Sequence, residues 1–266
     1  MVIPKKEKLG YLALIKVLAF TDFKLKYQGS ILGYLWSLVK PLVLFAVLYV
    51  VFTRFLRIGS SIENYPVYLL LGVIIWGFFG EMTSTSLDAI VGRGDLIRKI
   101  YFPRMVLIIS KSLTATMTFS LNFFVITFFI LFAGTHISEY VIFFPLLLIE
   151  LLVLLVGIAL FLSSLFVKFR DLAHIWEVSM QALFYATPIL YPLSLVPSPI
   201  NKVMMISPIA QIIQDMRYML ITEQTLTAGQ VLGPKLVIIP YMLPFIIAFF
   251  GYRHFNKSAA KFAENI

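Results

Sequence analysis

LGYLWSLVKPLVLFAVLYVVFT, residues 32–53, is a long apolar stretch with a single charged side chain, Lys40. A helix needs about 20 residues to cross a hydrocarbon core of about 30 Å, so this stretch predicts a transmembrane span. Further apolar runs predict spans at 65–86, 105–133, 141–167, 174–191 and 236–252, of which 174–191 is the least apolar. A composition of 60% hydrophobic and 13% charged residues agrees, because one soluble core could not bury so much apolar surface. The sequence therefore predicts an all-α integral membrane protein with six transmembrane helices in one domain, residues 1–266.

The basic residues predict the orientation, because cytoplasmic loops carry the excess of Lys and Arg. With the N-terminus inside, fifteen of the 22 basic residues are cytoplasmic: those before residue 27, between 93 and 104, at 168 and 170, and after 252. The outer side holds five, and Lys40 and Lys111 lie within apolar runs. Both termini are therefore predicted to be cytoplasmic.

Two segments outside the clear spans have patterns of their own. Residues 8–30 carry two apolar rows interrupted by lysines, which predicts an interfacial helix acting either as a simple anchor or as a gate. Residues 188–208 contain five prolines in an apolar stretch, which predicts short re-entrant helices at 190–213, on the outer side between spans five and six. The single domain is therefore divided into three parts: a cytoplasmic tail and gate helix at 1–30, the six-span bundle at 32–252 and a cytoplasmic tail at 253–266.

Several function classes find no support in the sequence. With no cysteine and three scattered histidines, neither a metal site nor a Cys nucleophile is predicted. The chain contains no H-E-x-x-H, no G-x-S-x-G and no G-x-x-x-x-G-K-[ST] motif, so we expect no enzyme activity, no bound cofactor and no ATP hydrolysis by this chain. The net charge of +9 falls between apolar runs, where it sets topology, so no nucleic-acid partner is predicted.

Four ionisable side chains lie inside the apolar runs, where charge is costly, and are functional candidates for that reason. Glu81 and Lys111 lie toward the cytoplasmic leaflet, where snorkelling or mutual pairing would explain them. Lys40 and Glu150 lie deeper and either face an interior pathway or stabilise helix packing. The stretch GSILG, Gly29–Gly33, matches the G-x-x-x-G pattern that allows close helix approach, in packing or in a dimer.

The loop GRGDLIRKIYFPRM, residues 92–105, combines basic residues with an apolar face. Gly92 and Gly94 permit a turn, DLIRKIYF can form a short helix, and Pro103 ends it. The side chains of its apolar residues would leave an exposed patch rimmed by charge, and such patches usually contact a partner. Contact with the membrane surface is the alternative.

Four motifs resemble, in order and spacing, the permeases of type-2 ABC polysaccharide exporters, which serve O-antigen, capsule and teichoic-acid export. They are FKLKYQGSILGYLWSLVKP at 23–41, LIRKIYFPRMV at 96–106, FRDLAHIWEVSMQALFYATPILYP at 169–192, and Ser207-Pro208, where many relatives carry Asn-Pro. The resemblance covers nearly the whole chain. It implies a homodimer of six-span subunits in the bacterial inner membrane, with two cytoplasmic ABC ATPase subunits that hold the ATP and Mg.

The resemblance also implies roles for particular residues. The loop at 92–104 corresponds to a coupling helix that enters a groove on the ATPase, and an Arg-Asp pair buried at a helix start would fix the second cytoplasmic turn. The predicted coupling residues are Leu96, Ile97, Arg98, Lys99, Ile100, Tyr101, Phe102, Arg170 and Asp171. Residues 8–30 correspond to a gate helix. Its residues Lys24, Lys26 and Tyr27 are predicted to contact a lipid-linked diphosphate. For the two lysines, anchoring to anionic membrane lipid is an equally good alternative.

Aromatic side chains in and beside the spans have two interpretations. Interfacial belts place Trp and Tyr at membrane surfaces, and sugar rings stack on aromatic faces. The candidates for a glycan pathway are Trp36, Tyr49, Trp76, Phe184, Tyr185 and Tyr191. The sequence thus predicts a permease subunit of an ATP-driven exporter that moves lipid-linked polysaccharide, with O-antigen favoured, through a pore at the homodimer interface. An ion- or proton-coupled carrier that acts without an ATPase is the alternative.

Overall fold

The computed structural model describes residues 5–99 and 102–262, without the side chains of residues 5–9, 27, 60, 61, 98 and 99. Every regular element within these ranges is a helix, which confirms the predicted all-α class. The longer helices are α1 (Lys5–Tyr27), α2 (Trp36–Val50), α3 (Tyr65–Leu87), α5 (Met105–Ala133), α6 (Phe144–Phe166), α7 (Leu172–Ala186) and α11 (Ile238–Ala259). The shorter ones are α4 (Gly94–Lys99), α8 (Ile200–Ile206), α9 (Pro208–Leu220) and α10 (Ala228–Leu236). Single turns are η1 (Gly33–Leu35), η2 (Val51–Phe55), η3 (Ile58–Ser61), η4 (Val91–Arg93), η5 (Glu139–Phe143) and η6 (Leu193–Leu195).

Five helical segments are long and apolar enough to cross a membrane: Gly33–Phe55, Tyr65–Leu87, Met105–Ala133, Glu139–Phe166 and Ile238–Ala259. They match five of the predicted spans. The remaining predicted span, 174–191, is not one continuous helix, because α7 has 15 residues and ends at Ala186, just before Thr187 and Pro188. The proline disfavours helical backbone at Thr187, whose backbone is extended. Six membrane crossings therefore remain a prediction.

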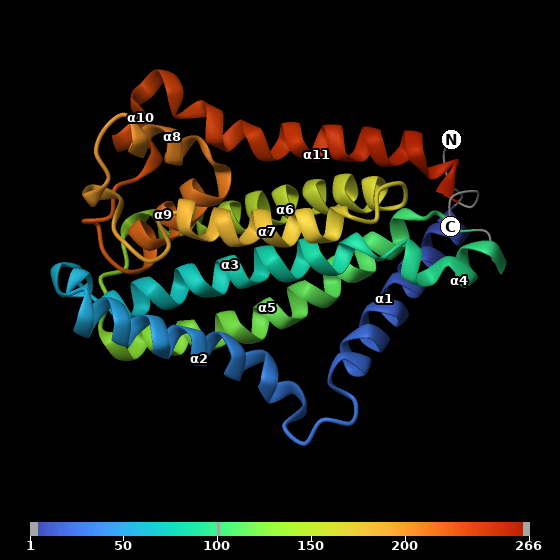
Figure 1. Ribbon diagram of the computed structural model, residues 1–266, viewed down its shortest axis with the longest axis horizontal. Helices are drawn as coiled ribbons and strands as arrows, with labels where there is room; N and C mark the ends of the chain where they lie inside the picture. Colours follow the sequence, from blue (N-terminus) through green and yellow to red (C-terminus); the bar gives the residue numbers. More distant parts are fainter. Residues whose placement is uncertain (1–4, 100–101, 263–266) are drawn as a thin grey trace.

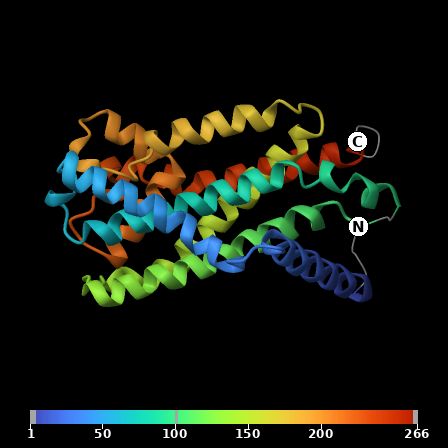
Figure 2. The same ribbon diagram turned by 60° about the horizontal axis from the view of Figure 1, so that its bottom comes forward.

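Helix α3 lies at the centre of the bundle. It contacts α2, α5, α6, α7 and α9, and most of its length is buried. From residue 65 to residue 80 its sequence is apolar all round, which is typical of a helix enclosed by other helices, whereas the turns from Glu81 onward are more polar. Helix α7 runs along the top edge of the bundle in Figure 2, and α2 lies below α3 in Figure 1. The described residues of α7 include no buried side chain, so this helix has an open outer face.

The two ends of the bundle differ in structure (Figure 1). Helices α8, α9 and α10 gather at one end, in the region where short re-entrant helices are predicted. Helix α4 and both chain termini lie at the other end, which is the predicted cytoplasmic side. Helix α1 packs beside α5 near this end through Leu14, Ile15 and Leu18. The shared location of the termini agrees with the predicted topology.

Close helix packing occurs between α6 and α11 and not at the predicted G-x-x-x-G match. A Cβ on Gly157 would lie 2.5 Å from the Cα of Ala248, and a Cβ on Gly251 would overlap the carbonyl oxygen of Gly157. Gly29 and Gly33 instead lie in and after the turn between α1 and α2, with φ of 77° and 47°. A Cβ on either glycine would meet no atom of the described residues within 4 Å. They serve the turn, because glycine adopts positive φ without steric cost.

Candidate functional site

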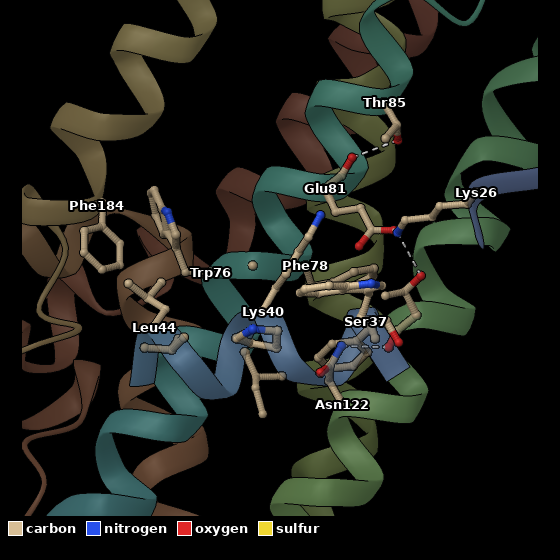
Figure 3. Close-up of a pocket in the computed structure, with 17 residues that line it drawn as sticks. Lys26, Ser37, Lys40, Leu44, Trp76, Phe78, Glu81, Thr85, Asn122 and Phe184 are labelled. Atoms are coloured by element: carbon tan, nitrogen blue, oxygen red, sulfur yellow. Dashed lines mark hydrogen bonds and ion pairs between the residues drawn. The ribbon is translucent and has the colours of Figure 1, made fainter. Parts of the chain in front are cut away.

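A cavity of about 350 Å³ lies between the first half of α2, the middle of α3, α5 and α7. Residues far apart in the sequence meet there, among them Lys26, Lys40, Trp76 and Phe184 (Figure 3). Trp36, Ser37 and Asn122 also line it. The site thus combines two lysines, large aromatic rings and small polar groups within an otherwise apolar bundle.

One edge of the cavity is closed by an ion pair between α1 and the central helix α3. The Nζ of Lys26 lies 2.6 Å from Oε1 of Glu81, and it also donates to Oγ1 of Thr118 at 3.4 Å. Figure 3 shows the two charged side chains pointing toward one another. The side chains of Lys26 and Glu81 are 35% and 21% exposed, so water screens the pair and we expect it to contribute about 1 kcal/mol or less. An ion pair of this strength can hold α1 against α3 and still open.

Aromatic rings form the wall of the cavity opposite the ion pair. The rings of Trp76 and Phe184 lie 5.9 Å apart at an angle of 58°, and Phe79 stacks on Trp76 at 5.2 Å. Lys40 reaches the cavity from α2, one position before Pro41. Lys40 is exposed on α2 and lines the cavity, and its place in an interior pathway remains a prediction.

A second hollow, of about 630 Å³, continues from the first along α3 and α7. The two share Leu44, Trp76 and Phe184. Glu177 and Gln181 line it from the same face of α7, and both are exposed. Together the two hollows form a groove on the outside of the bundle, which we call the α2–α7 groove.

The remaining predicted pathway and gate residues lie elsewhere. Tyr49 stacks near Tyr65, with ring centroids 6.4 Å apart, and does not line the cavity. Tyr191 donates from its hydroxyl to the carbonyl of Tyr185 at 2.9 Å, beyond the end of α7. Lys24 is exposed on α1 and lines neither hollow, and the side chain of Tyr27 falls outside the described residues. Of the glycan-pathway candidates, only Trp36, Trp76 and Phe184 lie together.

The predicted pairing of Glu81 with Lys111 is wrong. Glu81 pairs with Lys26, whereas Lys111 lies with its Nζ 3.3 Å from Oδ2 of Asp22. Arg93 forms a second ion pair with Asp22. The Asp22 carboxylate therefore joins three elements: the gate helix, the turn before α4, and α5. A displacement of α4 can reach the gate helix through this contact.

The predicted coupling residues divide into three groups. Phe102 is not part of the exposed apolar face predicted for the loop at 92–105. It is 7% exposed and packs in a cluster with Ile90, Leu107 and Phe255. Leu96 and Ile97 are half-buried against the same cluster, since α4 lies on the bundle and does not project freely. Ile100 and Tyr101, and the side chains of Arg98 and Lys99, fall outside the described residues.

Arg170 and Asp171 lie in the turn between α6 and α7, at the end of the bundle where α4 is found. Both are exposed, so the expectation of a buried pair is wrong for this turn. The guanidinium of Arg170 lies 5.3 Å from the centre of the Phe166 ring, a cation–π contact. The turn is short and open to water, and neither helix covers it.

Sequence reasoning missed the polar lining of the cavity. Ser37, Thr118 and Asn122 lie in apolar spans without a motif, and only their positions on inward faces of α2 and α5 distinguish them. Asn122 donates to the carbonyl of Thr118 one turn earlier at 3.0 Å. Such side chains cost little free energy in an apolar helix because they hydrogen-bond to their own backbone, so their presence in the sequence does not mark a site.

Comparison with known proteins assigns the chain. The ABC-2 type transporter family matches residues 13–221. The chain is 30% identical over 266 residues, 99% of both proteins, to "O-antigen export system permease protein RfbA" of Klebsiella pneumoniae. It is 31% identical over 189 residues to the protein of that name in Myxococcus xanthus, covering 71% of this chain and 72% of that protein. It is 21% identical over 205 residues to "Polysialic acid transport protein KpsM" of Escherichia coli, covering 75% of this chain and 78% of that protein. This chain therefore belongs to the ABC-2 type transporter family, whose members are multi-pass membrane transport subunits that work with an ABC ATPase.

Proposed function

We propose that this chain is the permease subunit of an ATP-driven exporter that moves a lipid-linked polysaccharide, in the first instance O-antigen, across the bacterial inner membrane. The names of the relatives support polysaccharide as the substrate class. The observation that carries the proposal is the cavity of Figure 3, in which Lys26 and Lys40 lie beside Trp36, Trp76 and Phe184. Lysines bind phosphate oxygens and aromatic faces stack on sugar rings, so one cavity offers both parts of a lipid diphosphate-linked glycan a partner.

The pore is proposed to form between two copies of this chain. Glu177 and Gln181 of α7 are exposed in the α2–α7 groove, and polar side chains are costly against lipid. A second copy placed over this groove would remove these groups from lipid and enclose a polar path. The apolar outer faces of α2 and α7, including Val43, Val47 and Ile175, would then make the contacts at its rim.

Two copies of a cytoplasmic ABC ATPase, with their ATP and Mg, are proposed to dock at the end of the bundle that carries α4. The turn at Lys168–Asp171 and the helix α4 both lie there. Motion of α4 would reach α1 through the Arg93–Asp22 ion pair and would change the contact between Lys26 and Glu81. The gate helix then opens the cavity to the inner leaflet, with both termini on the cytoplasmic side.

Substitution of Lys40 tests this proposal, with Lys24 as a matched control. Both changes, Lys40→Gln and Lys24→Gln, remove one positive charge, but only Lys40 lines the cavity. In cells that depend on this permease, we expect Lys40→Gln to reduce polysaccharide at the cell surface by about tenfold, as for loss of one charge-assisted contact worth ~1.4 kcal/mol. Lipid-linked precursor should accumulate inside, and Lys24→Gln should export normally.

Two results would contradict the proposal. Equal loss of export in both variants, at equal membrane levels, would indicate general attraction to anionic lipid instead of substrate contact. Transport by the purified chain in vesicles under an ion gradient, without an ATPase or ATP, would favour the alternative, a carrier acting alone.

A further inference from the structure

A separate cavity lies between η5, α6, α9, α10 and α11. Figure 1 shows these elements at the end of the bundle opposite α4. Its volume is about 450 Å³. Two carboxylates, Glu150 and Asp215, and three phenol rings, Tyr140, Tyr218 and Tyr241, line it. No Lys, Arg or His is found among the described residues of its lining. The cavity is thus acidic and aromatic, unlike the basic cavity of Figure 3.

One oxygen of Glu150 lacks a hydrogen-bond partner in the part of the chain that the structure describes. The residue is 5% exposed, and its Oε1 is buried without a donor. A buried carboxylate is costly unless a donor or cation satisfies it. Glu150 also lines the cavity, so its carboxylate group lies beside whatever fills that space.

Asp215 is held in place beside it by neutral donors. The hydroxyl of Tyr241 donates to Oδ2 at 2.5 Å, the side-chain amide of Gln211 donates to the same oxygen at 2.8 Å, and the backbone N–H of Ala228 donates to Oδ1 at 3.3 Å. These bonds orient the carboxylate without cancelling its charge. No ion pair from the described residues reaches either acid.

We propose that this cavity binds the primary ammonium head group of a membrane phospholipid. An ammonium group has three donors and no acceptor, which matches the free oxygen of Glu150 and the acceptors of Asp215. Phenol faces attract cations, and the three tyrosines surround the acids. A metal ion fits less well, because no group of three or more His, Cys, Asp or Glu side chains that could hold one exists among the described residues.

The surroundings of the cavity identify a lipid as the source of the amine. Glu150 lies six residues after the start of α6 at Phe144, or about 9 Å along a helix, so a head group that enters from the end of the bundle near η5 must descend into the cavity to reach it. Phe143 and Leu146 line the mouth and are exposed, and Ile149 extends this apolar surface along α6. Acyl chains can lie on that surface while the head group enters the acidic cavity. The inference depends on the chain spanning a membrane and not on the exported substrate.

Lipid binding to the full-length protein tests the proposal. Native mass spectrometry of the detergent-purified protein would compare phosphatidylethanolamine with its N-acetylated derivative and with phosphatidylglycerol, all with the same acyl chains. We expect phosphatidylethanolamine to bind at least about tenfold more tightly than either, the factor for one charge-assisted contact of ~1.4 kcal/mol. Glu150→Gln should abolish this preference, and Glu223→Gln, an exposed carboxylate after α9, should retain it.

Equal binding of the three lipids to the unmodified protein would overturn the proposal, and this comparison needs no variant to fold. Retention of the full preference by Glu150→Gln would also overturn it. Competition by soluble phosphoethanolamine at the concentration at which the lipid binds would show that the site takes a free amine, so the assignment to a lipid would be wrong.

Discussion

Arg217 offers a quantitative test of what holds the outer end of the bundle together. It is fully buried, at 0% exposure, and donates from Nε to the carbonyl of Tyr68 at 3.1 Å. Its two terminal nitrogens donate to the carbonyls of Pro188 and Ile189 at 2.6 and 2.7 Å. The guanidinium also lies 3.5 Å from the centre of the Tyr68 ring. One side chain therefore ties α9 and the non-helical segment after α7 to the central helix α3.

Replacing Arg217 with Met keeps the length of the side chain and leaves the carbonyls of Pro188 and Ile189 without their donor, whereas the Tyr68 carbonyl lies within helix α3. Each unsatisfied group costs about 1–3 kcal/mol, and part of this is regained because a buried charge is no longer desolvated. We expect a net loss of about 2–4 kcal/mol, the cost of two unpaired carbonyls reduced by the relief of that desolvation. At roughly 2–4 °C per kcal/mol for chains of this size, the Tm should fall by about 10 °C.

The assay is thermal unfolding of the purified protein in detergent, followed by tryptophan fluorescence. Arg217→Lys should lie between wild type and Arg217→Met, since an ammonium cannot reproduce the planar fork of donors. Gly72→Ala should also lower the Tm, because its Cβ would lie 2.5 Å from Nη2 of Arg217. Arg54→Met, at an exposed position, is the control. If Arg217→Met unfolds within about 2 °C of Arg54→Met, the reasoning from unsatisfied carbonyls is wrong.

Two further predictions concern helix packing and the ATPase. Gly251→Ala should destabilise the protein by about 1–3 kcal/mol, because its Cβ would overpack against Gly157. Gly77→Ala is the control, since a Cβ there would meet open space. Equal Tm values for the two variants would contradict the close approach of α6 and α11. Phe169→Asp should lose the partner ABC ATPase on co-purification, because Phe169 is exposed in the turn proposed for docking. Leu56→Asp, an equally drastic change at the opposite end, should retain it, and retention by both variants would place the docking surface elsewhere.

The functional site was only partly predictable from sequence. Lys26, Trp36, Trp76 and Phe184 were identified as candidates by charge, residue type and family resemblance, and the fold brings them to one cavity. Lys24 and Tyr185, chosen by the same criteria, do not line it. Neighbouring positions on a helix point in different directions, so the rotation of each helix decided which aromatic or basic side chain faces inward.

The sequence by itself determined the membrane class, the positions of five spanning segments and the location of the proline-rich outer region. These properties are local, since about 20 apolar residues suffice for a span and proline ends a helix wherever it occurs. Only the tertiary structure decided the partners of charged groups. It pairs Glu81 with Lys26 instead of Lys111, and it buries Arg217, which the sequence counted only as one of five basic residues on the outer side. From residue 65 to residue 80 helix α3 is apolar on every side, so its sequence pattern there could not show which neighbour each face would meet. The packing of the other helices around it made that choice.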